Sequence, residues 1–86
     1  MKEIYLNNYG QFLGKKSERL VVKEKGKIKR EEPFFKISRV IITSRGISLS
    51  TDAIEECMKR GIQIDFLNFK NEPYAKLSSP SIIQTN

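Results

Sequence analysis

The sequence has 86 residues, with sixteen basic against ten acidic side chains and a net charge of +6. This length suits one domain that buries about 60% of its unfolded surface, and it leaves no room for a second. The single cysteine, Cys57, excludes a disulfide framework and favours a reducing, cytoplasmic setting. No stretch approaches the roughly 20 apolar residues of a membrane span, and the first six residues are too polar for a signal peptide, so a membrane is not an expected partner.

The chain begins with two predicted strands and a turn. Residues 2–6 read as a first strand, and residues 11–13 resume extended structure until Gly14. Tyr9 lies in the Asn-Asn-Tyr-Gly connection, where its ring is a candidate for exposure. It is either an ordinary loop aromatic that caps the sheet or a platform on which an unpaired base stacks.

A β-hairpin is predicted next. Residues 18–24 and 27–31 are strands joined around Lys25 and Gly26. We expect Leu20 and Val22 to share one face with Ile28, which would direct Lys27 and Lys29 to solvent. Pro33 is expected to stop the second strand, because proline lacks the ladder donor.

The central unit of the chain reads as strand, turn, helix, strand. Phe34 and Phe35 are expected to fill the core before the strand at residues 39–43. A short strand at residues 47–50 leads to a helix at about residues 50–60, with Ser50 as N-cap and Gly61 as its stop. Its apolar face comprises Ala53, Ile54, Cys57 and Met58.

The last strands are residues 62–67 and 74–77. The sequence therefore predicts an α+β, β-rich fold, a two-layer or sandwich-like set of about seven or eight short strands with one covering helix. We expect residues 1–77 to form this domain and residues 78–86 to be a linker. Two adjacent isoleucines, Ile82 and Ile83, predict that the polypeptide continues or that this tail docks on a partner.

The positive charge is concentrated in one segment. Residues 15–30 hold eight basic and two acidic residues, a net charge of +6, and the remainder is balanced. Such a band on a balanced domain favours a polyanion, nucleic acid before membrane. The alternative is a lysine-blunted sheet edge that discourages aggregation. The basic residues of this segment are Lys15, Lys16, Arg19, Lys23, Lys25, Lys27, Lys29 and Arg30.

Residues for catalysis are missing from the sequence. There is no histidine, which removes the commonest general base and metal ligand. The carboxylates of Glu55, Glu56 and Asp65 read as surface charges, and no glycine-rich phosphate loop occurs. Cys57 without a histidine partner is inert. The chain is expected to be a binding or assembly module with no active site and no cofactor of its own.

An ordered series of motifs resembles a known family. The series begins with Leu-Gly-Lys-Lys-Ser-Glu-Arg-Leu-Val-Val at residues 13–22 and continues through Ile47-Ser-Leu-Ser50, Ala53-Ile54, Gly61-Ile62 and Phe66-Leu67 to Ala75-x-Leu77. It is similar to the amino-terminal β-domain of the CRISPR-associated integrase of spacer acquisition. The similarity covers Ile4 to about Leu77.

The resemblance implies a larger protein whose helical second domain carries a divalent metal, Mg or Mn, bound by Glu, His and Asp. None of those ligands maps onto this chain. It implies that the amino-terminal domain forms a homodimer, contacts duplex DNA and holds a splayed DNA end with an aromatic ring. It also implies a small CRISPR-associated nuclease-like partner. Tyr9 matches the segment that supplies the ring in some members.

We therefore interpret the chain as a dimerisation and DNA-positioning domain with phosphate contacts and no base readout. The alternatives are a freestanding basic β-domain that binds RNA or the ribosome, and a protein-interaction module. Arg45, at the tip of a turn, could also reach a phosphate. The predicted DNA-binding residues are Tyr9, Lys15, Lys16, Arg19, Lys23, Lys27, Lys29, Arg30 and Arg45.

Overall fold

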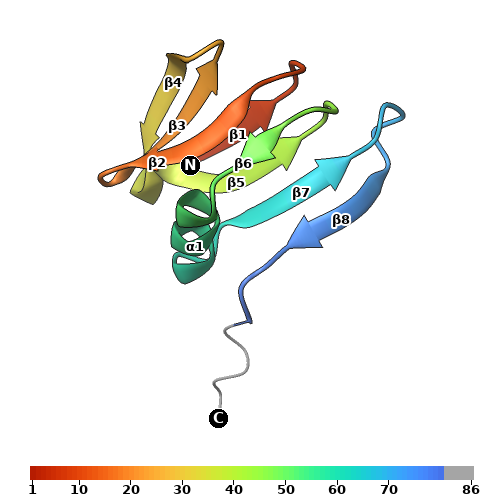
Figure 1. Ribbon diagram of the computed structural model, residues 1–86. Coiled ribbons are helices and arrows are strands. Elements are labelled where there is room, and N and C mark those ends of the chain that lie inside the picture. Colours follow the sequence, from red (N-terminus) through yellow and green to blue (C-terminus); the bar gives the residue numbers. More distant parts are fainter. Residues whose placement is uncertain (81–86) are drawn as a thin grey trace.

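Residues 1–80 are described by the structure, a computed structural model, and they form two four-stranded sheets with one α-helix (Figure 1). This confirms the predicted β-rich α+β fold. Sheet A has the strand order β1-β5-β7-β8, and sheet B has the order β4-β3-β2-β6. In chain order the elements are β1 (Lys2–Leu6), β2 (Phe12–Lys16), β3 (Arg19–Glu24), β4 (Lys27–Pro33), a 3-10 helix (Phe34–Lys36), β5 (Ile37–Ile42), β6 (Ser48–Leu49), α1 (Thr51–Lys59), β7 (Gln63–Leu67) and β8 (Pro73–Leu77).

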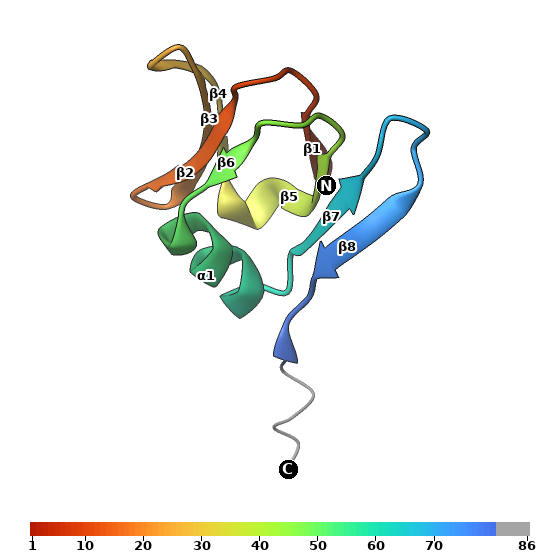
Figure 2. The same cartoon turned by 45° about the vertical axis from the view of Figure 1, so that its right-hand side comes forward.

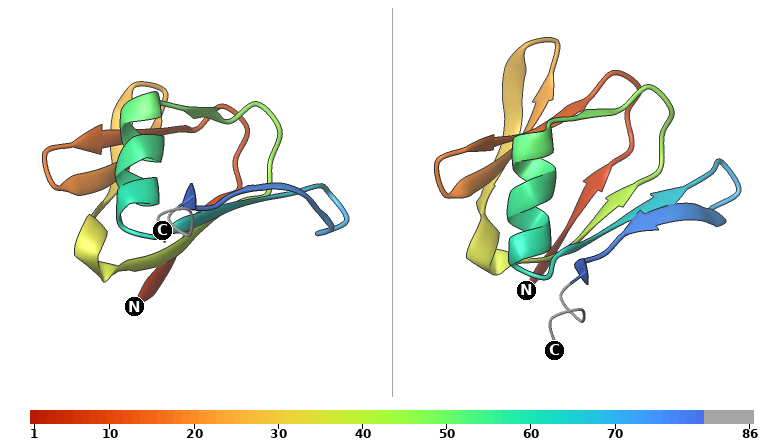
Figure 3. Two further views of the ribbon diagram at one scale, coloured as in Figure 1. Left: turned by 90° about the horizontal axis from the view of Figure 1, so that it is seen from below. Right: turned by 60° about the horizontal axis from the view of Figure 1, so that its bottom comes forward.

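The two sheets are built differently. In sheet A, β1, β5 and β7 run parallel and β8 is added antiparallel. In sheet B, β2, β3 and β4 form an antiparallel meander, with the short β6 parallel to β2. The chain crosses from sheet A to sheet B between β1 and β2, and it returns between β4 and β5. The hairpin β3–β4 extends beyond the rest of sheet B (Figures 1 and 3).

The core lies between the sheets and is closed on one side by α1. Its side chains come from the inner faces of both sheets, for example Leu13 and Leu20 from sheet B and Val40 and Ile64 from sheet A. Helix α1 lies between β2 and β7 and buries Ala53 and Cys57 completely (Figure 2). Its predicted N-cap is confirmed, because the Ala53 N–H donates to the Ser50 hydroxyl at 3.1 Å.

The predicted partner of Leu20 and Val22 is wrong. Ile28 is 41% exposed and pairs in register with Lys23 on the other face of β3. The cause is a register shift between Val22 and Lys23, where β4 has one extra residue. A one-residue shift moves a side chain to the opposite face of the sheet. The hairpin itself, with its turn at Lys25 and Gly26, is confirmed.

Two further expectations differ from the structure. Phe34 is buried, as expected, but Phe35 is 68% exposed, because the 3-10 turn directs adjacent side chains apart. Strand β2 does not end at Gly14 but continues to Lys16. The Phe12 ring covers this glycine, since a Cβ added there would lie 2.6 Å from Phe12 Cε2.

The carboxyl end of the described chain follows β8. Within residues 1–80 the single α-helix has nine residues and is too short to cross a membrane. The tail expectation for Ile82 and Ile83, and most of the linker expected at residues 78–86, lie outside the described residues.

Candidate nucleic-acid interface

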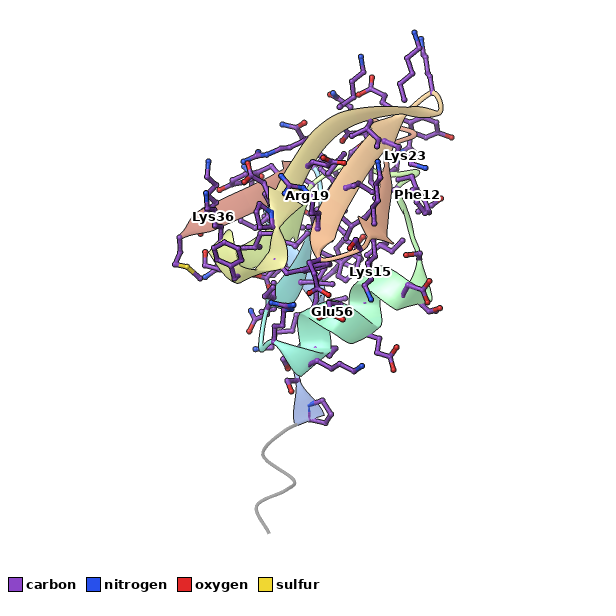
Figure 4. All side chains as sticks on the ribbon, turned by 90° about the vertical axis from the view of Figure 1, so that its left-hand side faces the viewer. Phe12, Lys15, Arg19, Lys23, Lys36 and Glu56 are labelled. Atoms are coloured by element: carbon purple, nitrogen blue, oxygen red, sulfur yellow. The ribbon has the colours of Figure 1, made fainter. Side chains whose placement is uncertain are left out.

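The basic segment forms most of sheet B. Residues 15–30 comprise the end of β2, all of β3 and the first half of β4. Figure 4 views this sheet and shows Phe12, Lys15, Arg19 and Lys23 spread over it, with Lys36 farther along the same side. The structure therefore brings eight of the nine predicted residues onto one sheet or the loop that leads into it, and it places Arg45 in the β5–β6 connection, where the next residue, Gly46, contacts Tyr9.

Carboxylates neutralise the base of the hairpin. Glu31 forms ion pairs with Lys16 at 3.9 Å and with Arg19 at 3.4 Å. Glu32 pairs with Arg30 at 3.6 Å and with Lys2 at 3.6 Å. These pairs are partly exposed and contribute little to stability. They lower the potential that the predicted residues Lys16, Arg19 and Arg30 present to a polyanion.

The tip of the hairpin keeps its charge. Within residues 1–80, Lys23, Lys25, Lys27 and Lys29 have no carboxylate within ion-pair distance. They flank the turn, where β3 and β4 extend from the sheet. The strongest uncompensated positive charge in this segment is therefore at the tip, farther from α1 than Lys15 and Lys16.

Glu56 is not the solvent-facing charge that the sequence predicts. It accepts a hydrogen bond from Arg60 Nε at 2.7 Å and forms an ion pair with Lys15 at 3.5 Å. Arg60 Nη2 also donates to Glu18 at 2.7 Å, and the guanidinium lies 5.4 Å above the Phe34 ring. The i,i+4 spacing of Glu56 and Arg60 is a signal that sequence reasoning could have used.

This cluster lowers one pKa. The hydrogen bond from Arg60, with the charge of Lys15 in addition, holds the pKa of the Glu56 carboxyl below its ordinary value of 4.5. Lys15 is thus engaged with α1, and it is a weaker phosphate candidate than the lysines at the hairpin tip.

Tyr9 lies in the loop between β1 and β2 with its ring 74% exposed. The ring lies against the backbone of Gly46, where an added Cβ would be 2.4 Å from Tyr9 Cε2. The Gly10 N–H also donates to the Gly46 carbonyl at 3.2 Å. The buried Gln11 side chain accepts from the Asn8 N–H at 3.0 Å and donates to Glu24 at 3.3 Å. The loop therefore holds an exposed ring in a fixed place.

Arg45 belongs to a different surface. It lines a groove of about 700 Å³ at the carboxyl ends of β1, β5 and β7, together with the exposed rings of Phe69 and Tyr74. Neither ring is a candidate from the sequence. Phe69 lies in the turn of the β7–β8 hairpin and Tyr74 in its edge strand, and the sequence around them has no pattern that distinguishes an exposed aromatic residue from a buried one.

Acidic and cysteine side chains are the candidate metal ligands within residues 1–80. No group of three or more Asp, Glu or Cys side chains in this part lies close enough to bind a metal ion, so the metal that the resemblance implies has no ligand set here. Burial raises the pKa of the Cys57 thiol to about 11, which leaves little reactive thiolate.

The chain matches a known family over nearly its whole length. The family of CRISPR associated protein Cas1 matches residues 4–85. The chain belongs to the Cas1 family. It is similar to the amino-terminal β-domain of that family, and its resemblance to a CRISPR integrase, drawn from the sequence motifs, is confirmed.

Relatives and solved structures agree with this assignment. The CRISPR-associated endonuclease Cas1 1 of Francisella tularensis subsp. novicida is 36% identical over 77 residues, which cover 90% of this chain and 24% of the relative. The chain spans about a quarter of the length of the curated relatives it matches.

Two solved structures share the fold. A partial Cas6-RT-Cas1–Cas2 complex superposes with a TM-score of 0.83 at 15% identity and covers 99% of this chain and 25% of its own. A TtCas1–DNA complex superposes with a TM-score of 0.78 at 8% identity and covers 94% of this chain and 30% of its own.

The lowered pKa of Glu56 gives a pH dependence of stability. A carboxyl whose pKa is lower in the folded state contributes stability at neutral pH, and that contribution is lost as pH falls through the folded-state pKa. We expect Glu56→Gln to flatten the fall in thermal midpoint between about pH 6 and pH 3. Glu55→Gln, an exposed neighbour without an ion pair in residues 1–80, is the control. Equal slopes for both variants would refute this role of Glu56.

Proposed function

We propose that the chain is the β-domain of a CRISPR adaptation integrase and serves homodimerisation and sequence-independent contact with the DNA backbone during spacer acquisition. The observation that carries the DNA contact is the set of four lysines without ion pairs in residues 1–80, at the tip of an extended hairpin. Nucleic acid binding by such lysines releases condensed counterions and needs no base readout.

The cutting and joining of DNA are proposed for the whole protein. The curated relatives are endonucleases by name, and this chain spans about a quarter of their length. The metal ligands for this chemistry are proposed to lie outside residues 1–80, where no group of three or more Asp, Glu or Cys side chains is close enough to bind a metal ion. Residues 78–86 are proposed to link the two domains. A Cas2 protein is a proposed partner, since a solved neighbour is a Cas1–Cas2 complex.

The proposed dimer uses the β8 edge of sheet A, whose other edge strand is β1. Strand β8 pairs only with β7 within residues 1–80, and it carries Tyr74 at 66% exposure, next to a turn with Phe69 at 88%. In sheet B, one edge strand, β4, is blunted by lysines, which oppose pairing between copies, and the other, β6, has only two residues. An unpaired edge flanked by aromatic rings favours a second copy of the chain, related by two-fold symmetry.

The proposed role of Tyr9 is to stack on the first unpaired base of a splayed DNA end. Its exposed ring has a fixed position on Gly46, so little conformational entropy is lost on stacking. Arg45 is the residue before Gly46 and is positioned to contact a nearby phosphate.

The hairpin contact predicts a steep salt dependence for duplex binding. Replacement of Lys27 and Lys29 by glutamine is expected to reduce the slope of log affinity against log salt by about 0.9 per lost contact. The matched control replaces Lys36 and Lys59, two exposed lysines without ion pairs in residues 1–80. Fluorescence anisotropy with a blunt duplex measures both. Equal slopes would exclude the hairpin contact, and tighter binding of structured RNA would favour the RNA-binding alternative.

The stacking role predicts a preference for forked ends. Tyr9→Leu is expected to reduce the ratio of forked to blunt duplex affinity about 10-fold, because base stacking contributes about 1–3 kcal/mol. Tyr9→Phe should keep the preference. Tyr5→Leu is the control, because Tyr5 is an exposed tyrosine that lies in sheet A rather than in the loop. A preference unchanged in Tyr9→Leu would contradict the stacking role.

The edge interface predicts a dimer that depends on Tyr74. Tyr74→Arg is expected to weaken dimerisation by about 30-fold or more, since a central aromatic residue typically contributes 2 kcal/mol or more. Phe35→Arg is a closely matched control, because Phe35 is 68% exposed and Tyr74 is 66% exposed. Sedimentation equilibrium measures the constant. A wild-type chain that stays monomeric at high concentration would rule out the interface.

A further inference from the structure

A second feature of sheet B is a groove on its outer face. The groove has a volume of about 400 Å³ and lies between the β2–β3–β4 meander and the start of α1. Phe12, Gly14, Val21 and Ile28 supply its apolar surface. The register places Lys23 directly opposite Phe12 on β2 and opposite Ile28 on β4, and it places Val21 opposite Gly14. The register shift in the hairpin therefore brings Ile28 to the face of the sheet that carries the groove.

Phe12 holds the centre of this surface. Its ring is partly buried and lies across Gly14, where any larger residue would clash with it. The remaining surface of the ring lines the groove. A ring fixed on the backbone in this way is a preorganised platform, since it loses little rotamer freedom when another flat group packs on it. Such stacking tolerates every base, because each base has a π-face.

The charges around this ring favour an anionic ligand. Lys16, Lys15 and Lys23 line the groove against one carboxylate, Asp52, at its helix end. Lys15 is paired with Glu56, and Lys16 shares Glu31 with Arg19, but Lys23 has no ion pair within residues 1–80. Figure 4 shows Lys23 next to Phe12. An uncompensated cation beside an accessible aromatic ring fits a phosphate joined to a flat base.

We propose that this groove binds an unpaired nucleotide of a single-stranded nucleic acid, with the base on Phe12 and the phosphate at Lys23 and Lys16. A duplex cannot use the ring, because its bases are paired and stacked. The groove thus goes beyond the proposed duplex contact and adds a path for a separated strand. Tyr9 and Phe12 are three residues apart, at most about 11 Å along the chain, so one strand could contact both rings.

The experiment measures the binding of labelled oligo-dT and oligo-U, each twelve nucleotides long, by fluorescence anisotropy. The comparison of the two affinities also shows whether the bound nucleotide comes from DNA or from RNA. We expect Phe12→Leu to weaken binding about 10-fold and Phe12→Tyr to retain it, because stacking requires a ring rather than apolar volume. Lys23→Gln should lower the salt slope by about 0.7, the value for one contact with a single strand. Its position on the sheet surface keeps this second test independent of any folding defect in the Phe12 variants.

The control is Phe35→Leu, which removes an equally aromatic side chain beside Lys36, away from the groove. Thermal melts verify that each variant is folded. Unchanged affinity in Phe12→Leu, or no binding of either oligonucleotide, would overturn the inference. An oligo-glutamate peptide could also compete for the groove. If Phe12→Leu weakened binding of this peptide more than binding of oligo-dT, the inference would be overturned in favour of an acidic peptide as the ligand. Lys23 belongs to both proposed contacts, so the Phe12 variants make the distinction: duplex binding with its salt slope intact in Phe12→Leu would leave the proposed function standing even if the inference about the groove failed.

Discussion

The packing of α1 between β2 and β7 is the contact on which the rest of the structure depends. Ala53 and Cys57 are completely buried there and close the side of the core that the two sheets leave open. Because β2 is held against the helix on its inner face, the outer face of sheet B is left to solvent. The same contact fixes the edge where β6 ends and the groove begins. The positions of the basic residues follow from this arrangement.

Electrostatics divides sheet B into two parts. Near α1 and the hairpin base, Glu31, Glu32 and Glu56 offset the charges of six basic residues. Toward the tip, Lys23 to Lys29 have no such partners within residues 1–80. The two interpretations of the positive band, a site for a polyanion and a lysine-blunted sheet edge, therefore apply to different parts of the sheet. The base resembles a blunted sheet edge, and the tip keeps the field that a phosphate backbone requires.

The sequence predicted the elements of the fold more successfully than the positions of single side chains. Alternation, Ser50 and Gly61 were sufficient for the hairpin and the helix, because these signals act within a few residues. The exposure of Ile28 and Phe35 depended on a register shift and a 3-10 turn, and no local pattern indicates either. The groove at Phe12 and the partners of Glu56 arise between strands and helix, so only the tertiary structure shows them. The family resemblance, by contrast, was readable from ordered motifs alone.

Arg60 has a mechanical consequence for the hairpin. It joins α1 to the turn before β3 through Glu56 and Glu18, while the Glu18 carbonyl accepts from the Phe34 N–H at 3.1 Å after β4. Both ends of the hairpin are thus clamped at one point, and its turn is free. The hairpin is held at its base and along β3 by β2 as far as Lys23, and only its turn extends beyond that pairing. A force applied by a bound molecule at Lys25 would therefore reach β2 through its pairing with β3, and the end of α1 through the contact of Arg60 with Glu18.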